Sequence, residues 1–320
     1  MKFVSVPENY ALMEEGLVYD IDLGSLRDSV EVSIVDADDN SVAARLRFAQ
    51  TAFVSIDIAP YVRRMFAVKP EPGETGARVE TGRTVSVAVE VDGTRSEVRK
   101  YTLFTVDGVP RLLTTMPMLR RLAAGQFDEI AFYAPDGLRI VVATEFEEGA
   151  RVQRRSYTIP EKYRDLWVMR IAPETGATGC TVWFEWRDRT ETVVYEVVQM
   201  PAEAVRVAWV ASTGAVEYYT FPTLARETLN VEKSGFSGRC GRCTTDIEAR
   251  KTMVAVSDCE PRAVVDALEE IISSPAVWMV RAEGPCGLQV LTSESSLRFD
   301  GSLNTVAIEF VAAKPWEELR

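Results

Sequence analysis

The sequence of 320 residues contains no histidine. Histidine is the side chain whose ordinary pKa lies closest to neutrality, and it is the commonest ligand for transition metals. Its absence excludes Ser-His-Asp and Cys-His catalysis, histidine-containing zinc sites and the facial triad of non-haem iron. Because no other reactive constellation is present, we expect a protein that is not an enzyme.

The sequence also lacks long apolar runs. No window reaches the roughly eighteen apolar residues that a membrane-spanning helix requires. Met1–Gly16 has neither the apolar core nor the small-residue cleavage site of a secretory signal. We therefore expect synthesis in the bacterial cytoplasm and no membrane partner. The cysteine count of five, an odd number, fits a reducing compartment better than a disulfide framework.

Basic residues are outnumbered, with 36 Lys and Arg against 48 Asp and Glu and a formal net charge of −12. A surface that binds nucleic acid must neutralise phosphates, so we expect no nucleic-acid partner. Apolar residues make up 47% of the chain and charged residues 26%, which is a globular composition. At about 100 to 200 residues per domain, the length predicts two or three domains.

Alternating apolar and polar residues mark strands in the first third of the chain. Val30–Phe48 alternates on both sides of a polar turn, and Val85–Gly93 ends in Asp-Gly, a strong hairpin signal. A short helix is expected at Asp57–Phe66, with a proline near its start. We predict an N-terminal β domain with one short helix over residues 1–110.

Strand patterns continue beyond this domain. Thr192–Val198 carries apolar residues on both faces, which predicts a strand covered on both sides in a middle β domain over residues 111–222. Val264–Ile272 has helical spacing, and residues 223–320 are predicted to form a C-terminal α+β domain. The expected fold is mainly β, with two or three β-sandwich-like domains in tandem, the last α+β with one clear helix.

Cys240 and Cys243 form the one Cys-x-x-Cys pattern. It is a weak candidate for half of a zinc site completed by Cys259 and Cys286, because thiolates two residues apart can share one metal on a tight turn. The alternatives are a redox pair and plain thiols. The spacing to the other two cysteines is irregular, so we favour plain thiols and expect no metal or cofactor.

Two acidic clusters are candidate sites: Asp36, Asp38, Asp39 and Asn40, and Glu145, Glu147 and Glu148. The first has oxygen ligands for calcium but not the spacing of an EF-hand, which favours a hairpin turn. The second contains carboxylates that a strand would place on one face, as an acid/base pair requires. Solvated charges on a strand edge are the favoured interpretation of this second cluster.

Aromatic residues gather in the middle of the chain: Trp183, Trp186, Trp209, Tyr218 and Tyr219. Their ring faces could stack on sugars, but core packing or a subunit contact is favoured because no polar cluster brackets them. Trp278 and Trp316 are weighed in the same way. We take Tyr218, Tyr219, Trp278 and Trp316 as the interface candidates.

Three segments in this order carry a resemblance: Asp57–Phe66, Ala208–Phe221 and Leu268–Trp278. Together they resemble an uncharacterised family of tail-region structural proteins of Bacteroidetes phages and prophages. The resemblance implies a virion structural role and supplies no catalytic residues.

We therefore expect a virion protein, a tail subunit that contacts copies of itself and other phage tail proteins as a homo-oligomer. Strand edges and aromatic patches would make these contacts. The alternatives are a carbohydrate- or receptor-binding tail module and a hydrolase that uses carboxylates without histidine.

Overall fold

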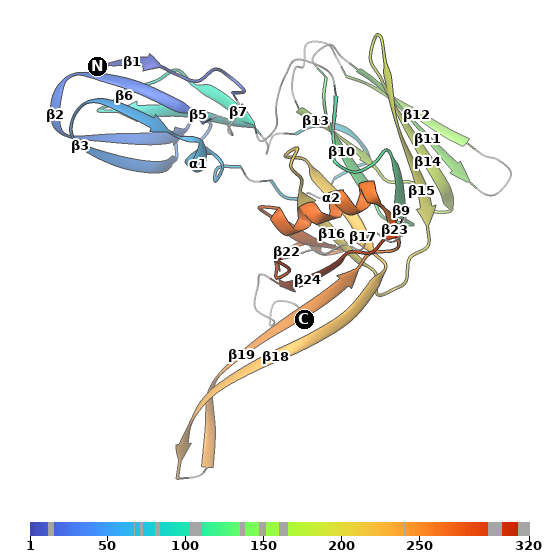
Figure 1. Cartoon of the computed structure of the whole chain (residues 1–320). Helices are drawn as coiled ribbons and strands as arrows, with labels where there is room; N and C mark the ends of the chain where they lie inside the picture. The colour runs from blue at the N-terminus through green and yellow to red at the C-terminus, as the bar shows by residue number, and fades with distance from the viewer. Residues whose placement is uncertain are drawn as a thin grey trace. The chain divides into compact units, whose positions relative to one another are not determined.

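The computed structural model describes residues 1–11, 16–66, 68–70, 73–80, 84–102, 111–134, 138–146, 152–159, 166–239, 241–293 and 303–312. The predicted mainly β fold is confirmed, since strands dominate and the described residues hold two helices (Figure 1). The chain divides into two compact units. The first comprises Met1–Val68, Arg78–Arg111 and Asp165–Trp167, and the second Lys69–Ala77, Leu112–Arg164 and Val168–Arg320. The boundaries near residues 110 and 222 stay predictions.

The first unit is built on a six-stranded antiparallel sheet. Its strands are β1 (Lys2–Ser5), β2 (Val18–Asp36), β3 (Val42–Asp57), β5 (Thr84–Val91), β6 (Thr94–Arg95) and β7 (Arg99–Thr102). The predicted alternation holds, because Val30, Val32 and Ile34 on β2 are at most 2% exposed. Burying such β-branched side chains contributes about 1.5 to 3 kcal/mol each and fixes which face of the strand points inward.

Local signals explain how the first unit turns. Asp92 and Gly93, with φ of 47° and 76°, form the tip between β5 and β6, which is the predicted hairpin. Helix α1 (Ala59–Val62) is shorter than the predicted Asp57–Phe66. Asp57 lies outside it at the end of β3, where its carboxylate accepts hydrogen bonds from two backbone N–H groups at 2.7 and 2.9 Å.

The second unit contains a five-stranded sheet of order β12-β11-β14-β15-β9. Its strands are β9 (Leu119–Ala123), β11 (Leu138–Phe146), β12 (Val152–Ile159), β14 (Ala177–Glu185) and β15 (Thr190–Val198). A four-stranded sheet of β4 (Gly76–Val79), β13 (Leu166–Ile171), β10 (Asp128–Tyr133) and β8 (Arg111–Leu113) adds further strands. β10 belongs to the second unit, as does β13 from Val168 onward.

A seven-stranded sheet of order β17-β16-β21-β22-β24-β19-β18 completes the second unit. Its strands are β16 (Val205–Val210), β17 (Val216–Phe221), β18 (Thr223–Gly238), β19 (Gly241–Val256), β21 (Val277–Arg281), β22 (Gly284–Val290) and β24 (Ala307–Ala312). β20 (Glu260–Pro261) pairs with β23 (Leu303–Asn304) in a short ladder, and β20 directly precedes helix α2 (Arg262–Ser273) in the sequence.

Helix α2 (Arg262–Ser273) packs against the seven-stranded sheet, as the predicted periodicity requires. Its buried residues Val264, Val265, Leu268 and Ile271 join a core with Trp209. The helix ends before Pro275, since a residue that precedes proline is disfavoured in the helical conformation. Within the described ranges, no helix is both long and apolar enough to cross a membrane.

Candidate assembly site

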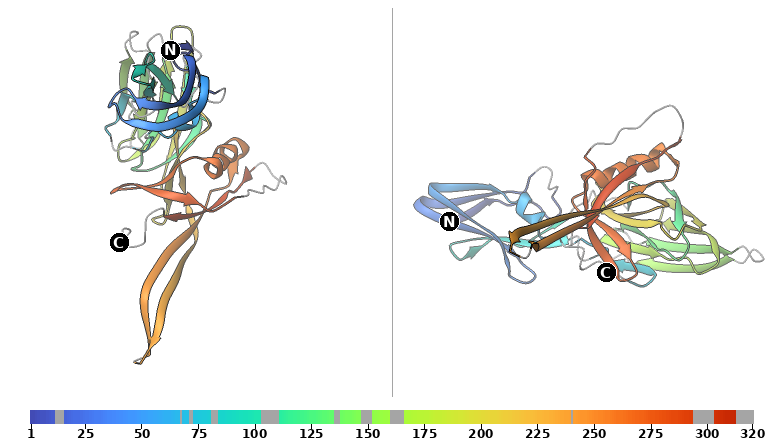
Figure 2. Two further views of the ribbon diagram at one scale, coloured as in Figure 1. Left: turned by 90° about the vertical axis from the view of Figure 1, so that its left-hand side faces the viewer. Right: turned by 90° about the horizontal axis from the view of Figure 1, so that it is seen from below.

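The hairpin of β18 and β19 extends well beyond the sheet that holds its base (Figure 2). β19 pairs with β24 only over Thr252–Val256, whereas its register with β18 continues out to Gly238 and Gly241. We call Leu229–Lys251 the arm. At about 3.3 Å per residue, Leu229–Gly238 spans roughly 30 Å. No strand is predicted here from the sequence, so the arm is a new feature of the structure.

One face of the arm is apolar. The register places Leu229 opposite Lys251, Val231 opposite Ala249 and Lys233 opposite Ile247. Directly opposed residues share a face, so these six side chains lie together and form what we call the apolar arm face. Leu229, Val231 and Ile247 are 53%, 43% and 58% exposed. This face is open to solvent.

The other face of the arm is polar and exposed. It carries Asn230, Glu232, Glu248 and Arg250, and a guanidinium nitrogen of Arg250 lies 2.5 Å from a carboxylate oxygen of Glu248. A strand with one apolar and one polar face is the usual pattern of a sheet covered on one side. Along the arm that cover is absent among the described residues, which makes the apolar arm face a candidate contact surface.

The apolar arm face leads into a small hollow at its base. The hollow, of about 120 Å³, is lined by Glu227, Lys251, Met253, Met279, Arg281, Cys286, Leu288 and Ala312. Met253 faces the same way as Lys251, two residues away on β19. Methionine side chains adapt to partners of varied shape, so the hollow extends the contact surface into the body of the unit.

A second feature, not predicted from the sequence, is a cluster of buried charges in the second unit: Arg120, Asp128, Glu129, Arg170, Arg206 and Glu217. Each side chain is at most 5% exposed. Arginines and carboxylates are equal in number, which limits the large cost of burying unpaired charge. The strands that carry them, β9, β10, β13, β16 and β17, belong to three different sheets.

Asp128 is the centre of this cluster. The Arg120 guanidinium donates to its Oδ2 at 3.0 Å, and the Tyr195 hydroxyl donates to the same oxygen at 2.9 Å. Arg206 Nη2 lies 3.9 Å from Oδ1. Because these partners come from β9, β15 and β16, the hydrogen bonds fix one sheet of the unit against another.

A second carboxylate, Glu129, holds the neighbouring part of the cluster. It accepts a hydrogen bond from the Tyr218 hydroxyl at 2.8 Å and pairs with Arg170 at 3.8 Å. The Arg170 guanidinium lies 3.6 Å from the centre of the Phe127 ring, a cation–π contact. Glu129, Arg170 and Tyr218 are buried, so their hydrogen bond and ion pair hold the sheets together.

Glu217 is the carboxyl whose protonation depends most visibly on the fold. Burial raises its pKa from 4.5 to about 7, against the attraction of the Arg120 guanidinium 3.5 Å away. Its Oε1 accepts the Thr115 backbone N–H at 3.1 Å. At about pH 7 the Glu217 carboxyl is therefore partly protonated in the folded protein.

The signal that could have found the cluster is a single charged residue inside an apolar run. Arg170 interrupts the buried run of β13, and Glu217 interrupts that of β17. Isolated charges in fully buried strands need a partner, whatever the sheet topology. The sequence alone does not say which charges pair, because the partners are distant in the chain.

The interface candidates are distributed unevenly. Tyr218 and Tyr219 are only 4% and 8% exposed, and their hydroxyls donate to Glu129 and Glu260, both at 2.8 Å. Both side chains are buried in the protein interior, which corrects the expectation that they form a subunit contact. Trp278 on β21 is half-buried, and Trp316 lies outside the described residues.

The structure describes the side chains of two of the four cysteine candidates. Cys259 is exposed and Cys286 is half-buried. Cys240 lies outside the described residues, as does the side chain of Cys243. Within the part of the chain that the structure describes, no group of three or more potential ligands is placed to hold a metal.

The first acidic cluster fits the hairpin-turn interpretation. Asp36 and Asp39 accept the backbone N–H groups of Asp38 and Ser41 at 2.9 and 2.7 Å, and Asn40 has a φ of 59°. These are the bonds of a hairpin turn. Glu145 is exposed on β11, whereas Glu147 and Glu148 lie outside the described residues.

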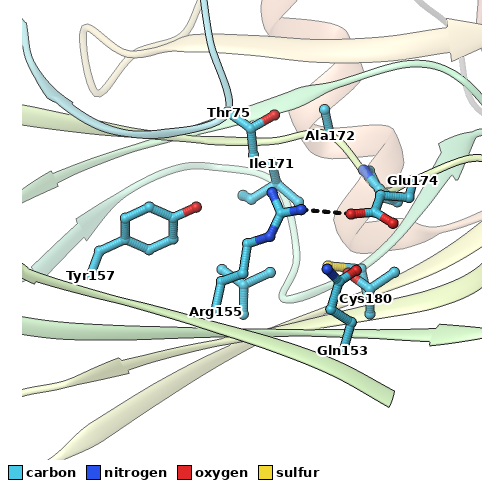
Figure 3. A pocket seen from close by; sticks show the side chains of 11 residues that line it. Thr75, Gln153, Arg155, Tyr157, Ile171, Ala172, Glu174 and Cys180 are labelled. Atoms are coloured by element: carbon cyan, nitrogen blue, oxygen red, sulfur yellow. Dashed lines mark hydrogen bonds and ion pairs between the residues drawn. The ribbon is translucent and has the colours of Figure 1, made fainter. Parts of the chain in front are cut away.

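The inner side of the five-stranded sheet holds a narrow hollow of about 20 Å³, shown in Figure 3. Arg155 pairs there with Glu174 at 2.6 Å, beside Cys180. The volume suffices for about one water molecule. Burial raises the pKa of the Cys180 thiol to about 11, which keeps it protonated and unreactive near neutral pH.

The outer side of the same sheet differs from the prediction. Thr192–Val198 is not covered on both faces, because Val194 is 38% exposed while Val193 and Tyr195 are buried. Trp183 on the neighbouring β14 is half-buried on this outer side. Trp186 and Trp209 are core residues, 7% and 0% exposed. Of the aromatic candidates on β14 to β17, Trp183 is thus the one that faces solvent.

Comparisons with known proteins give no assignment. No protein-family model matches the chain, and no curated protein matches it significantly.

Proposed function

We propose that this chain is a structural subunit of a phage or prophage tail, held to its neighbours by the arm. The observation that carries the proposal is the exposed apolar arm face on a ribbon without a core of its own. Isolated two-stranded hairpins are at best marginally stable in water. A partner that covers Leu229, Val231 and Ile247 stabilises the ribbon and gains the free energy of burying them, about 1.5 to 3 kcal/mol each at full burial.

The partners proposed are copies of the same chain and other tail proteins. Lys233 lies on the apolar arm face, whereas Lys251 is already paired with Glu227 at 2.7 Å, and the chain as a whole carries a net charge of −12. The surface of a second copy therefore offers carboxylates to Lys233, and this charge complementarity favours an arm-to-body contact. Repeating such a contact by rotation gives a closed ring, and repeating it with translation gives a tube.

Assembly is tested by light scattering and negative-stain imaging of the purified full chain. We expect rings or tubes, and a triple variant of the apolar arm face, Leu229→Thr, Val231→Thr and Ile247→Thr, should remain monomeric. Threonine keeps the preference for extended structure and removes apolar area. The matched control is Asn230→Thr, Glu232→Thr and Glu248→Thr on the polar face, which should assemble like the parent.

The location in the virion needs its own experiment. Gold-labelled antibody against the chain, applied to particles induced from the host, should decorate the tail. If assembly depends on the arm but the antibody does not label tails, the subunit role is retained and the location in a virion tail is refuted. A parent chain that forms no particles with itself or with a lysate of phage-producing cells would refute the subunit role.

A further inference from the structure

The outer face of the five-stranded sheet presents a shallow hollow of about 380 Å³. Its lining residues are Arg139, Val141, Arg154, Arg155, Ser156, Trp183 and Glu185. The volume lies within the range of small-molecule sites, about 300 to 1,000 Å³. The hollow lies wholly in the second unit, far along the chain from the arm.

The strand register explains how these residues meet. Trp183 pairs with Val141 on one side and with Thr192 on the other, and Val141 pairs with Ser156. Directly opposed residues in antiparallel strands share a face, so these four form one row across the sheet. The row places an indole between hydroxyl-bearing side chains at about 4.8 Å per strand.

The two flanking rows carry charge. Arg139 pairs with Glu185 in one, and their side chains form an ion pair at 3.2 Å, with 61% and 37% exposed. Arg154 stands in the other row, opposite Ala143. Each row lies about 7 Å from Trp183, two residues along the strand. Among the described residues, no carboxylate lies within ion-pair distance of Arg154.

We infer that this hollow binds an acidic saccharide, a sugar that carries a carboxylate. The indole of Trp183 offers an apolar face for the C–H groups of a pyranose ring. Ser156, Thr192 and Glu185 exchange hydrogen bonds with sugar hydroxyls. Arg154 is placed to pair with the sugar's carboxylate, a geometry that the planar guanidinium favours.

Charge distribution selects this class over nucleic acid. Arg139 and Arg155 already pair with Glu185 and Glu174, so the ligand must satisfy Arg154 and tolerate Glu185, which requires one or a few anionic groups among many hydroxyls. A phosphate backbone brings repeated charge against a chain of net charge −12, which repels it. The site goes beyond the proposed assembly role and does not depend on the arm.

The test uses the full chain with a short oligomer of galacturonic acid as the probe and a neutral glucose oligomer of equal length as its control. Binding is measured by titration calorimetry. Arg154→Gln should weaken binding of the acidic oligomer at least about tenfold, equivalent to about 1.4 kcal/mol. Arg45→Gln is the matched control, since this exposed arginine lies on β3 in the other unit, outside the hollow, and should bind like the parent.

A second variant removes the stacking surface. Trp183→Ala should also lose at least about tenfold in affinity, and a melting curve shows whether it remains folded. If Trp183→Ala does not fold, Arg154→Gln alone decides, because its side chain is exposed. The inference is overturned if acidic saccharides do not bind, if Arg154→Gln binds like the parent, or if single-stranded DNA binds and saccharides do not.

The triple variant of the apolar arm face separates the two proposals. It should bind the acidic oligomer like the parent while remaining monomeric. Loss of assembly with saccharide binding intact supports this site. Loss of both activities in that variant would overturn the independence of the site.

Discussion

The protonation of Glu217 links pH to stability at the scale of a single residue. Burial raises its pKa in the folded chain from 4.5 to about 7. Between these values the unfolded chain releases the proton and the folded chain keeps it, so the group's contribution to stability falls as pH rises. Below about pH 4.5 both states are protonated, and above about pH 7 the loss is complete.

Glu217→Gln removes this titration. Relative to the parent, the variant should gain roughly 3 kcal/mol of unfolding free energy between about pH 4 and pH 8, whatever its offset at low pH. Urea denaturation at a series of pH values measures the difference. Glu232→Gln, on the exposed polar face of the arm, is the control and should run parallel to the parent. Parallel curves for Glu217→Gln would contradict the raised pKa.

The same residues show what a sequence can and cannot reveal about a buried site. Arg170 and Glu217 are visible as lone charges in apolar runs. Their partners are not visible, because Arg120 and Glu217 lie 97 residues apart on strands of two different sheets. The sequence predicts an interface at Tyr218 and Tyr219 because the acceptors of their hydroxyl groups are not visible in it either. Aromatic side chains with a buried hydroxyl need an acceptor, and the acceptors lie 89 and 41 residues away.

At the scale of elements, local patterns predicted regular structure where burial enforces it. The alternation in β2 and the helical spacing in α2 both follow from one buried face. The arm was missed because its composition is polar and glycine-containing, and its apolar face becomes visible only when the two strands are paired in register. The prediction that β15 is buried on both faces is wrong, because a strand can carry apolar residues such as Val194 on a face that no other element covers.

A substitution in helix α2 tests how this helix packs on the seven-stranded sheet. Leu268 is 0% exposed within that core. Leu268→Ala should destabilise the second unit by about 2 to 5 kcal/mol, because it removes buried apolar area and leaves a cavity. Ser273→Ala at the exposed end of the same helix is the control, expected within about 0.5 kcal/mol of the parent. Thermal and urea unfolding test this, and equal stabilities would contradict the packing of α2 described above.

At the scale of the whole molecule, charge and apolar area act in opposite directions on assembly. A net charge of −12 on each copy repels other copies. An exposed ion pair, such as the one that Lys233 would make with a neighbour, contributes only about 0 to 1 kcal/mol. Burial of the apolar arm face contributes more, so it should dominate the contact, while Lys233 orients it.

Self-association should therefore strengthen with salt. Raising ionic strength from about 0.01 M to about 0.15 M shortens the screening length from roughly 30 Å to roughly 8 Å, which weakens the repulsion between copies and leaves apolar burial intact. Sedimentation velocity at the two salt concentrations should show a shift toward larger species for the parent and none for the triple variant of the apolar arm face. Dissociation of the parent with rising salt would instead identify a contact dominated by lysine–carboxylate pairs, and the apolar arm face would then not be the surface that holds the assembly.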